Sequence, residues 1–345
     1  MLGTLKKYIK QHLFSPLLVR SRFLSNLYYC LFSRNFSREH QAVLAGRMKH
    51  LSELNKTRSN YYLLVRNTHR IEKGLLMRPR KAHFASSYLQ ETMDSFNAVW
   101  GNRQVEESSD GQKKWFKDVL SEYFAVVEDT PLIQTERRRF KALVNGAENL
   151  SAPDRSIPYV REPGMFSNIS YEEFYKLTRQ RRSVRWFLPN PVPRKLIDKA
   201  LMAALQSPSA CNRQPFEFRI FDDPHQVAAL SSIPMGTKGY GHRLPVFVVI
   251  IGNLDAYPYE RDRHVIYIDG SLAAMTFMLA LETLGLSSCP INWPDIEERE
   301  RQMEKALKLE PWQRPILCIG LGYPDPAGKV AFSEKRTLKQ IRTYH

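Results

Sequence analysis

A dense group of arginines lies in the segment TRQRRSVRWF, residues 178–187. The basic residues in it are Arg179, Arg181, Arg182 and Arg185. Guanidinium groups are permanently charged and present paired N–H donors that match phosphate oxygens, and Ser183 adds a hydroxyl among them. Trp186 and Phe187 follow directly and tie the group to packed structure, which argues against a solvated basic helix face. The segment therefore predicts a phosphate-binding site.

A second polar segment, SPSACNRQPF at residues 207–216, follows further along the chain. Its two prolines restrict the backbone, while Ser209, Asn212 and Gln214 offer short polar side chains. Such side chains can hydrogen-bond the edge of a planar heteroaromatic ring. Taken alone the segment is typical of an ordinary polar loop, so its interpretation depends on its place after the arginine cluster.

The elements around these segments predict a sheet covered by helices. Ser170 and Glu173 form a capping-box pattern that begins a helix leading into the arginines. Pro193 suits the first turn of the next helix, and residues 271–286 are apolar throughout and predict a buried helix that ends at Gly285. Strands are expected at 216–221, 245–252 and 315–324, the last two buried. The order indicates the α+β class.

The first half of the chain has a different pattern. Residues 1–150 show apolar spacing typical of helices, interrupted by a polar loop over 101–114. Three prolines and a glycine in residues 151–164 cannot continue a helix and predict a linker. We therefore expect a helical N-terminal extension over 1–150, a linker over 151–164 and a second domain over 165–345.

Composition places the chain among folded globular proteins. Hydrophobic residues make up 43% and charged residues 25%, which excludes wholesale disorder. The net charge of +16 favours polyanionic partners, either nucleic acid, anionic lipid or phosphorylated small molecules. The four cysteines are far apart and form no CxxC pair, so we expect neither a zinc site nor a disulfide framework. A cytoplasmic location fits best.

The sequence is compatible with two locations for the N-terminal residues. No run of about 18 apolar residues predicts a transmembrane helix, and residues 1–32 lack the features of a signal peptide. These residues alternate basic and apolar types and contain no acid. They are expected either to lie on an anionic membrane as a basic amphipathic helix, at the inner face, or to dock on the protein's own body.

In their order, the two polar segments resemble the motifs of the nitroreductase family of FMN proteins. That family opens with an arginine-serine-arginine signature followed by a Pro-Ser-x-x-Asn-x-Gln-Pro loop. The resemblance covers residues 170–345 and includes SLAAMTFMLALETLGLSSCPI, which is similar to the family's central helix and following loop. It implies a nitroreductase-like fold with a central mixed sheet flanked by helices.

The resemblance also implies roles for individual residues. The FMN phosphate and ribityl chain would be held by Arg181, Arg182, Ser183 and Arg185, together with Lys335 and Arg336 near the chain end. The isoalloxazine ring would be lined by Pro208, Ser209, Asn212 and Gln214, a loop that in this family often comes from the partner subunit of a homodimer. The N5 edge would be lined by Pro290, Ile291 and Asn292, with Trp293 next.

By this resemblance the protein is an FMN-dependent oxidoreductase that uses NADH or NADPH to reduce a small organic acceptor. Reduced FMN passes hydride from N5 to an acceptor on its face, so no catalytic side chain is nominated and no metal site is expected. Asn292 and Trp293 stand where the family commonly has Glu-Gly, so the acceptor is expected to differ. Lys238 and Arg243 lie near a position that the family uses but match no motif.

Two other classes stay open beside this one. The net charge of +16 suits a protein that binds nucleic acid or an anionic membrane surface, although no nucleic-acid motif is present and nucleic acid is not an expected partner. A flavin fold could also serve as a scaffold or bind FMN as a substrate. The segment RNTHRIEKGLLMRPRK, residues 66–81, could reach over the flavin, recognise an acidic substrate or bind a partner. A solvated helix with a basic loop is the preferred interpretation of it.

Overall fold

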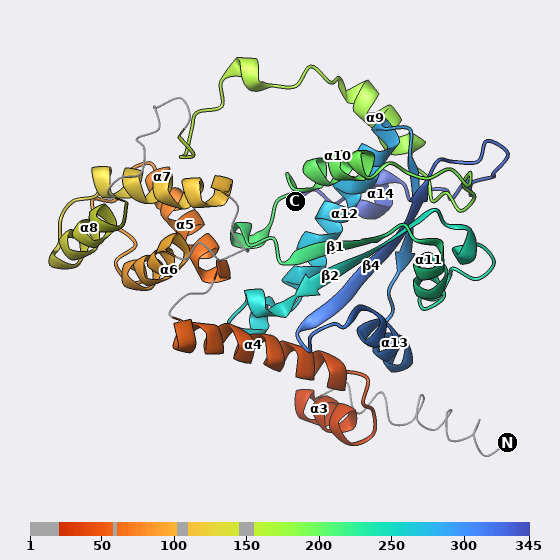
Figure 1. Ribbon diagram of the computed structural model, residues 1–345, viewed down its shortest axis with the longest axis horizontal. Helices are drawn as coiled ribbons and strands as arrows, with labels where there is room; N and C mark the ends of the chain where they lie inside the picture. Colours follow the sequence, from red (N-terminus) through yellow and green to blue (C-terminus); the bar gives the residue numbers. More distant parts are fainter. Residues whose placement is uncertain (1–20, 58–60, 102–109, 145–154) are drawn as a thin grey trace.

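The computed structural model describes residues 21–57, 61–101, 110–144 and 155–345, and its C-terminal half is built on one sheet (Figure 1). The sheet has four strands in the order β1-β2-β4-β3. Their bounds are β1 Phe216–Phe221, β2 Val246–Asn253, β3 Ser287–Asn292 and β4 Gln313–Gly322. The α+β class is confirmed.

The pairing within this sheet differs from the mixed sheet that we expected. All three neighbouring pairs of strands are antiparallel. The helices α11 (Pro224–Ser231) and α13 (Glu297–Leu307) each return the chain so that the following strand runs in the opposite direction. Among the described residues, parallel pairing is limited to an isolated bridge between Ser183 and Ser288.

Strand β2 contributes residues to both hydrophobic cores of this half. Its residues alternate between two clusters: Val246, Val248 and Ile250 face the helices α10 (Arg194–Ala204) and α12 (Val265–Thr283), while the residues between them face α11 and α13. Figure 1 shows α10 and α12 on one side of the strands and α13 on the other. The prediction of a strand buried on both faces is confirmed.

Strand β3 was not predicted as a strand. It contains Pro290, which cannot donate a hydrogen bond to a neighbouring strand. The strand order places β3 at an edge of the sheet, where a proline is tolerated. The capping box of Ser170 and Glu173 at helix α9 (Tyr171–Gln180) is confirmed, and Gly285 follows α12 with a φ of 73°, as a helix stop requires.

Helix α12 is the central helix of this half. Among the described helices it is the one long and apolar enough to cross a membrane, with a mean hydropathy of 1.5 over the best window in Glu260–Thr283. It packs against α10 and the sheet, and it buries Asp269 and Glu282. The same length and composition are typical of the core helix of a globular protein.

The first half contains α3 (Arg22–Leu31), α4 (Ser37–Thr57), α5 (Tyr61–Leu75), α6 (Leu89–Gly101), α7 (Asp110–Val126) and α8 (Pro131–Val144). Helices α5 to α8 share a hydrophobic core whose largest members include Phe96, Phe116 and Tyr123. The loop predicted over 101–114 is shorter, because Asp110 to Lys114 already belong to α7. Residues 102–109 of that loop lie outside the described residues, as do residues 151–154 of the predicted linker.

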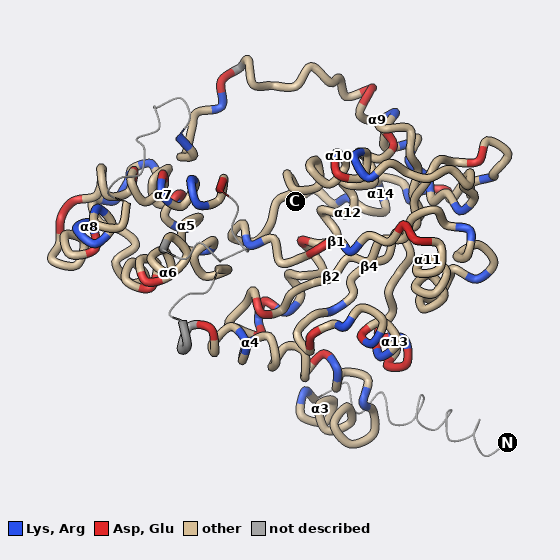
Figure 2. The backbone as a smooth tube through the Cα atoms, viewed as in Figure 1, with Lys and Arg blue, Asp and Glu red and all other residues tan. Residues whose placement is uncertain are grey.

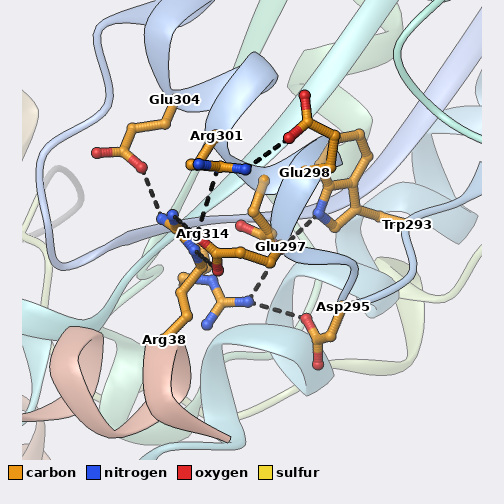
Figure 3. Close-up of polar contacts among 9 residues, drawn as sticks. Arg38, Trp293, Asp295, Glu297, Glu298, Arg301, Glu304 and Arg314 are labelled. Carbon is orange, nitrogen blue, oxygen red and sulfur yellow. Dashed lines mark hydrogen bonds and ion pairs between the residues drawn. The ribbon is translucent and has the colours of Figure 1, made fainter. Parts of the chain in front are cut away.

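Helix α4 packs against the C-terminal half. Ala42 belongs to the core beneath α10 and α12, and a Cβ on Gly46 would lie 2.7 Å from the backbone of Leu254. Arg38 donates to Glu297 and Glu304 of α13, a helix that carries both acidic and basic residues (Figures 2 and 3). The division into 1–150, 151–164 and 165–345 stays a prediction, and the contacts of α4 cross it.

Candidate functional site

The arginine cluster is fixed to the edge of the sheet. The backbone N–H of Val184 donates to the carbonyl of Ser288 at the start of β3 over 3.0 Å. Further along, the N–H of Leu188 donates to Tyr323 just after β4, over 2.9 Å. These bonds fasten residues 183–188 beside β3 and the end of β4, so the segment is part of the packed structure as predicted.

Charge in this cluster is not balanced by nearby acids. Within the described ranges, none of Arg181, Arg182 and Arg185 forms an ion pair with a carboxylate. The Nε of Arg181 is buried without a hydrogen-bond partner, and so is the hydroxyl of Ser288. Buried polar groups are normally paired, so these two point to a missing anionic partner.

Two residues that sequence reasoning did not assign join the cluster. The ring of Tyr240 lies 5.9 Å from the guanidinium carbon of Arg185, and Arg243 lies at the same distance from the ring of Trp186. Both belong to the turn around the short helix η5 (Gly241–Arg243). The basic character of Arg243 was visible in the sequence, but its position beside the cluster depends on the fold.

The side chain of Cys289 also lies within reach of this charge. It contacts the hydroxyl of Tyr240 at 3.7 Å. Burial raises the pKa of the Cys289 thiol, while Tyr240, Arg185 and Arg181 oppose that rise. Both arginines therefore lie close to β3.

The predicted N5-edge residues are in β3 but differ in exposure. Pro290 is half-buried, Ile291 is buried in the core beneath α11 and α13, and Asn292 is exposed at the strand's end. Trp293 is buried, and its Nε1 donates to Glu300 over 2.8 Å (Figure 3). Glu300 also binds the buried Arg314, so Trp293 is held in a structural network.

The predicted ring-lining loop is anchored to α12. The hydroxyl of Ser209 donates to Asp269 over 2.6 Å and accepts from the N–H of Gln214 over 2.7 Å. The N–H of Ala210 also donates to Asp269, over 2.9 Å. The Ser209 hydroxyl therefore organises the loop, which contains the short helix η4 (Ala210–Asn212).

Backbone strain is concentrated in the same loop. Cys211, Asn212 and Gln214 have φ values of 55°, 55° and 50°, in the left-handed region that side chains disfavour. The Nε2 of Gln214 donates to the side chain of Asn212 over 3.2 Å. Strain of this kind costs roughly 1–3 kcal/mol per residue and is typical of functional loops. The loop therefore has a defined shape that its anchors maintain.

The loop and the arginine cluster both attach to α12. Ser207 at the start of the loop donates to Thr276 over 2.8 Å, and Asp269 accepts from Ser209 and Ala210. Glu282 accepts from Gln180 next to the arginines, over 3.1 Å, and lies about 20 Å from Asp269 along the helix axis at a rise of 1.5 Å per residue. No hydrogen bond or ion pair between described residues joins Pro208, Ser209, Asn212 or Gln214 to the arginines, so their common site stays a prediction.

The terminal basic pair makes its contacts away from the arginine cluster. Lys335 and Arg336 are exposed, and Arg336 donates to the carbonyl of Gln340 in α14 (Leu338–Ile341) over 2.7 Å. No hydrogen bond or ion pair between described residues joins either of them to Arg181 or Arg185. Their convergence on one phosphate stays a prediction. Among the described residues, no three His, Cys, Asp or Glu side chains gather as a metal site would require.

Comparison with known proteins finds a family match for the C-terminal part of the chain. Residues 178–237 and 234–323 match the model of the nitroreductase family. Rat (Rattus norvegicus) iodotyrosine deiodinase 1 is 24% identical over 214 residues, which are 53% of this chain and 73% of that protein. A provisionally named NADH dehydrogenase/NAD(P)H nitroreductase of Archaeoglobus fulgidus is 28% identical over 158 residues, 44% of this chain and 86% of that one.

A solved structure of an FMN-dependent nitroreductase from Clostridium difficile is 25% identical. It has a TM-score of 0.42 and matches 49% of this chain and 98% of its own.

Proposed function

We propose that this protein is an FMN-dependent oxidoreductase that uses NADH or NADPH to reduce a small organic acceptor. The observation that carries the proposal is the group of arginines at β3 that have no carboxylate partner, with the buried and unpartnered Nε of Arg181 among them. A phosphate ester brings about two negative charges and three acceptor oxygens, so it fits this donor set. The match of residues 178–323 to the nitroreductase family model and the name of the Clostridium difficile structure support FMN as the group.

The chain's own residues would bind and orient this group. Arg181, Arg182 and Arg185 would hold its phosphate, with Ser183 beside them. When bound, FMN supplies hydride transfer at N5 of its ring. We propose no acceptor more specific than a small organic molecule, because relatives named for nitroreduction and for iodotyrosine deiodination both match this chain.

We further propose that the working form is a homodimer with flavin sites at the subunit interface. The ring-lining loop is anchored at Asp269 and Thr276 of α12, the phosphate cluster lies beside Glu282, and no hydrogen bond between described residues joins them, so we propose that a second copy supplies the loop. Helix α12 exposes Ile268 (56%), Leu272 (42%) and Met275 (39%) on one face. Exposed apolar residues gathered in this way are typical of subunit interfaces.

An absorption spectrum of the purified protein tests the flavin proposal. We expect a yellow protein whose flavin is bleached by NADH or NADPH. The variant Arg181→Ala/Arg185→Ala should lose most of its flavin, because each guanidinium contributes charge-assisted bonds worth about 1.5 to 3 kcal/mol. The control Arg138→Ala/Lys141→Ala removes the same charge from α8 and should retain FMN. Colourless protein that takes up no added FMN would overturn the proposal, and net consumption of FMN would identify it as a substrate.

For location, we propose a cytoplasmic protein whose α3 contacts an anionic membrane surface. No residue of α3 is buried, and Phe23 (71%) and Leu31 (63%) are among its exposed side chains. This exposure favours a lipid surface over docking on the protein's own body, and the absence of acids from residues 1–32 suits anionic lipid. Sedimentation with anionic vesicles should fall in Leu27→Glu/Leu31→Glu and remain in Leu76→Glu/Met77→Glu. Equal sedimentation of all three proteins would contradict this placement.

A further inference from the structure

A second basic pocket lies between α5 and the loop that contains η4. It has a volume of about 390 Å³. Helix α5 contributes Arg66, Arg70 and Lys73, which follow one another at helical spacing. The loop contributes Arg213, and Tyr257 closes the pocket beside it. The pocket is distinct from the arginine cluster at β3, because it shares no residue with it.

The cations of this pocket outnumber its acid. Arg70 is already occupied, since it donates to Asn67 and stacks on Tyr88 with the guanidinium carbon 3.6 Å from the ring centroid. The pocket's acid, Asp262, has Arg261 as its ion-pair partner at 3.8 Å. Arg66, Lys73 and Arg213 have no carboxylate partner among the residues that the structure describes. Three cations are thus available to a ligand.

Two residues that line the pocket each have a buried polar group without a partner. Arg213 is 7% exposed and its Nε forms no hydrogen bond, and Tyr257 is 3% exposed with an unbonded hydroxyl. The guanidinium carbon of Arg213 lies 4.8 Å from the ring centroid of Tyr257. Burial lowers the pKa of Arg213, and the nearby charge of Arg66 adds to that effect. A buried cation that forms no ion pair is costly, which favours the binding of an anion beside it.

We propose that this pocket binds the phosphate group of a small phosphorylated molecule other than the flavin. A phosphate monoester carries about two negative charges and three acceptor oxygens. It can therefore accept from Arg66, Lys73 and Arg213 together and from the Tyr257 hydroxyl. A single carboxylate would leave most of this charge unmatched. The binding site does not depend on the proposed flavin chemistry, although its ligand would contact the loop that carries Ser209 and Gln214.

Calorimetric titration of the FMN-loaded protein with inorganic phosphate, at fixed ionic strength, tests the site. We expect one saturable site per chain. The double variant Arg66→Ala/Lys73→Ala should bind phosphate about tenfold more weakly or worse, because it loses two charge-assisted contacts. The control Arg138→Ala/Lys141→Ala removes the same charge from α8 and should stay within about twofold of the unaltered protein, because distant charges are screened. Acetate should compete poorly.

The substitution Tyr257→Phe gives a second test that preserves the shape of the side chain. It removes a hydroxyl that is unbonded in the free protein, so the melting temperature should hold or rise. Phosphate should nevertheless bind about threefold more weakly or worse, because the hydroxyl is a donor only in the complex.

Three results of the phosphate titrations would overturn the proposal. They are the absence of saturable binding, equal weakening in the α8 control, and acetate binding as tightly as phosphate. Loss of FMN from Arg66→Ala/Lys73→Ala would also overturn it, because the flavin phosphate would then occupy this pocket. Loss of FMN from Arg181→Ala/Arg185→Ala alone would leave the proposal standing.

Discussion

The backbone N–H of Val184 donates to the carbonyl of Ser288, and this bond joins the arginine cluster to an edge strand. Strand β3 and the cluster are about a hundred residues apart in sequence, so the sheet must form before the cluster has its shape. The positions of Arg181 and Arg185 therefore depend on the sheet as much as on their own segment.

The replacement Arg243→Ala should weaken FMN binding. Arg243 lies beside Trp186 in the same basic group and has no carboxylate partner among the described residues, so its removal lowers the positive charge that faces a phosphate. We expect a loss of about tenfold in affinity, measured by flavin fluorescence titration. Lys238→Ala provides the nearby control, because this lysine has no recorded contact with the cluster. Equal affinities of the two variants would remove Arg243 from the site.

The replacement Ser209→Ala should loosen the ring-lining loop. It leaves Asp269 with one fewer donor and the N–H of Gln214 without its acceptor. Leaving such buried groups unpaired costs about 1–3 kcal/mol of the free energy of unfolding. Urea unfolding and amide hydrogen exchange of residues 209–214 measure the effect. The control Ser232→Ala removes a hydroxyl that is bonded only within its own turn and should change stability by less than about 0.5 kcal/mol. An unchanged exchange rate at Gln214 would show that Ser209 does not organise the loop.

Charge on the exposed face of α12 should separate the proposed dimer. The double variant Ile268→Glu/Leu272→Glu places two carboxylates in that apolar face, so the subunits should repel each other. Sedimentation should then give a monomer, and the flavin should be lost together with the partner's loop. Met235→Glu alters an exposed apolar residue elsewhere and should leave the dimer intact. A monomer that retains its flavin would contradict the shared site.

The replacement Arg38→Ala should weaken the docking of α4, and the effect should depend on pH. Arg38 holds the pKa of Glu297 below its usual range. A carboxyl with a lowered pKa in the folded protein adds stability above its unfolded pKa, about 4.3, and loses this contribution as the pH falls through the folded value. The difference in melting temperature between the two proteins should therefore be larger at pH 7 than at pH 3. Arg138→Ala, which removes an exposed arginine with no carboxylate partner among the described residues, is the control and should show no such dependence on pH. A difference that grows on acidification would exclude this mechanism.

Local sequence patterns predicted several elements correctly. The capping box at Ser170 and the helix stop at Gly285 depend on a few neighbouring residues, and so does the continuous apolar run of β2. Strand β3 was missed because Pro290 is an unfavourable strand residue, and only the order of the strands shows that it lies at an edge.

The candidate sites could be predicted only in part. The arginine cluster was evident from spacing, but the addition of Tyr240 and Arg243 depends on tertiary contacts. Residues 66–81 were interpreted as a solvated helix with a basic loop. The structure leaves the basic loop at 76–81 exposed, as predicted, but it buries Ile71 and places Arg66 and Lys73 in one pocket with Arg213. A single sequence contains no signal that connects residues so far apart.

The close approach of Gly46 to Leu254 has a consequence for the inheritance of this protein. A side chain at position 46 would collide with main-chain atoms of Leu254, so a larger residue there would push α4 away from the C-terminal half. Position 46 and the chain around Leu254 are therefore constrained to change together during evolution.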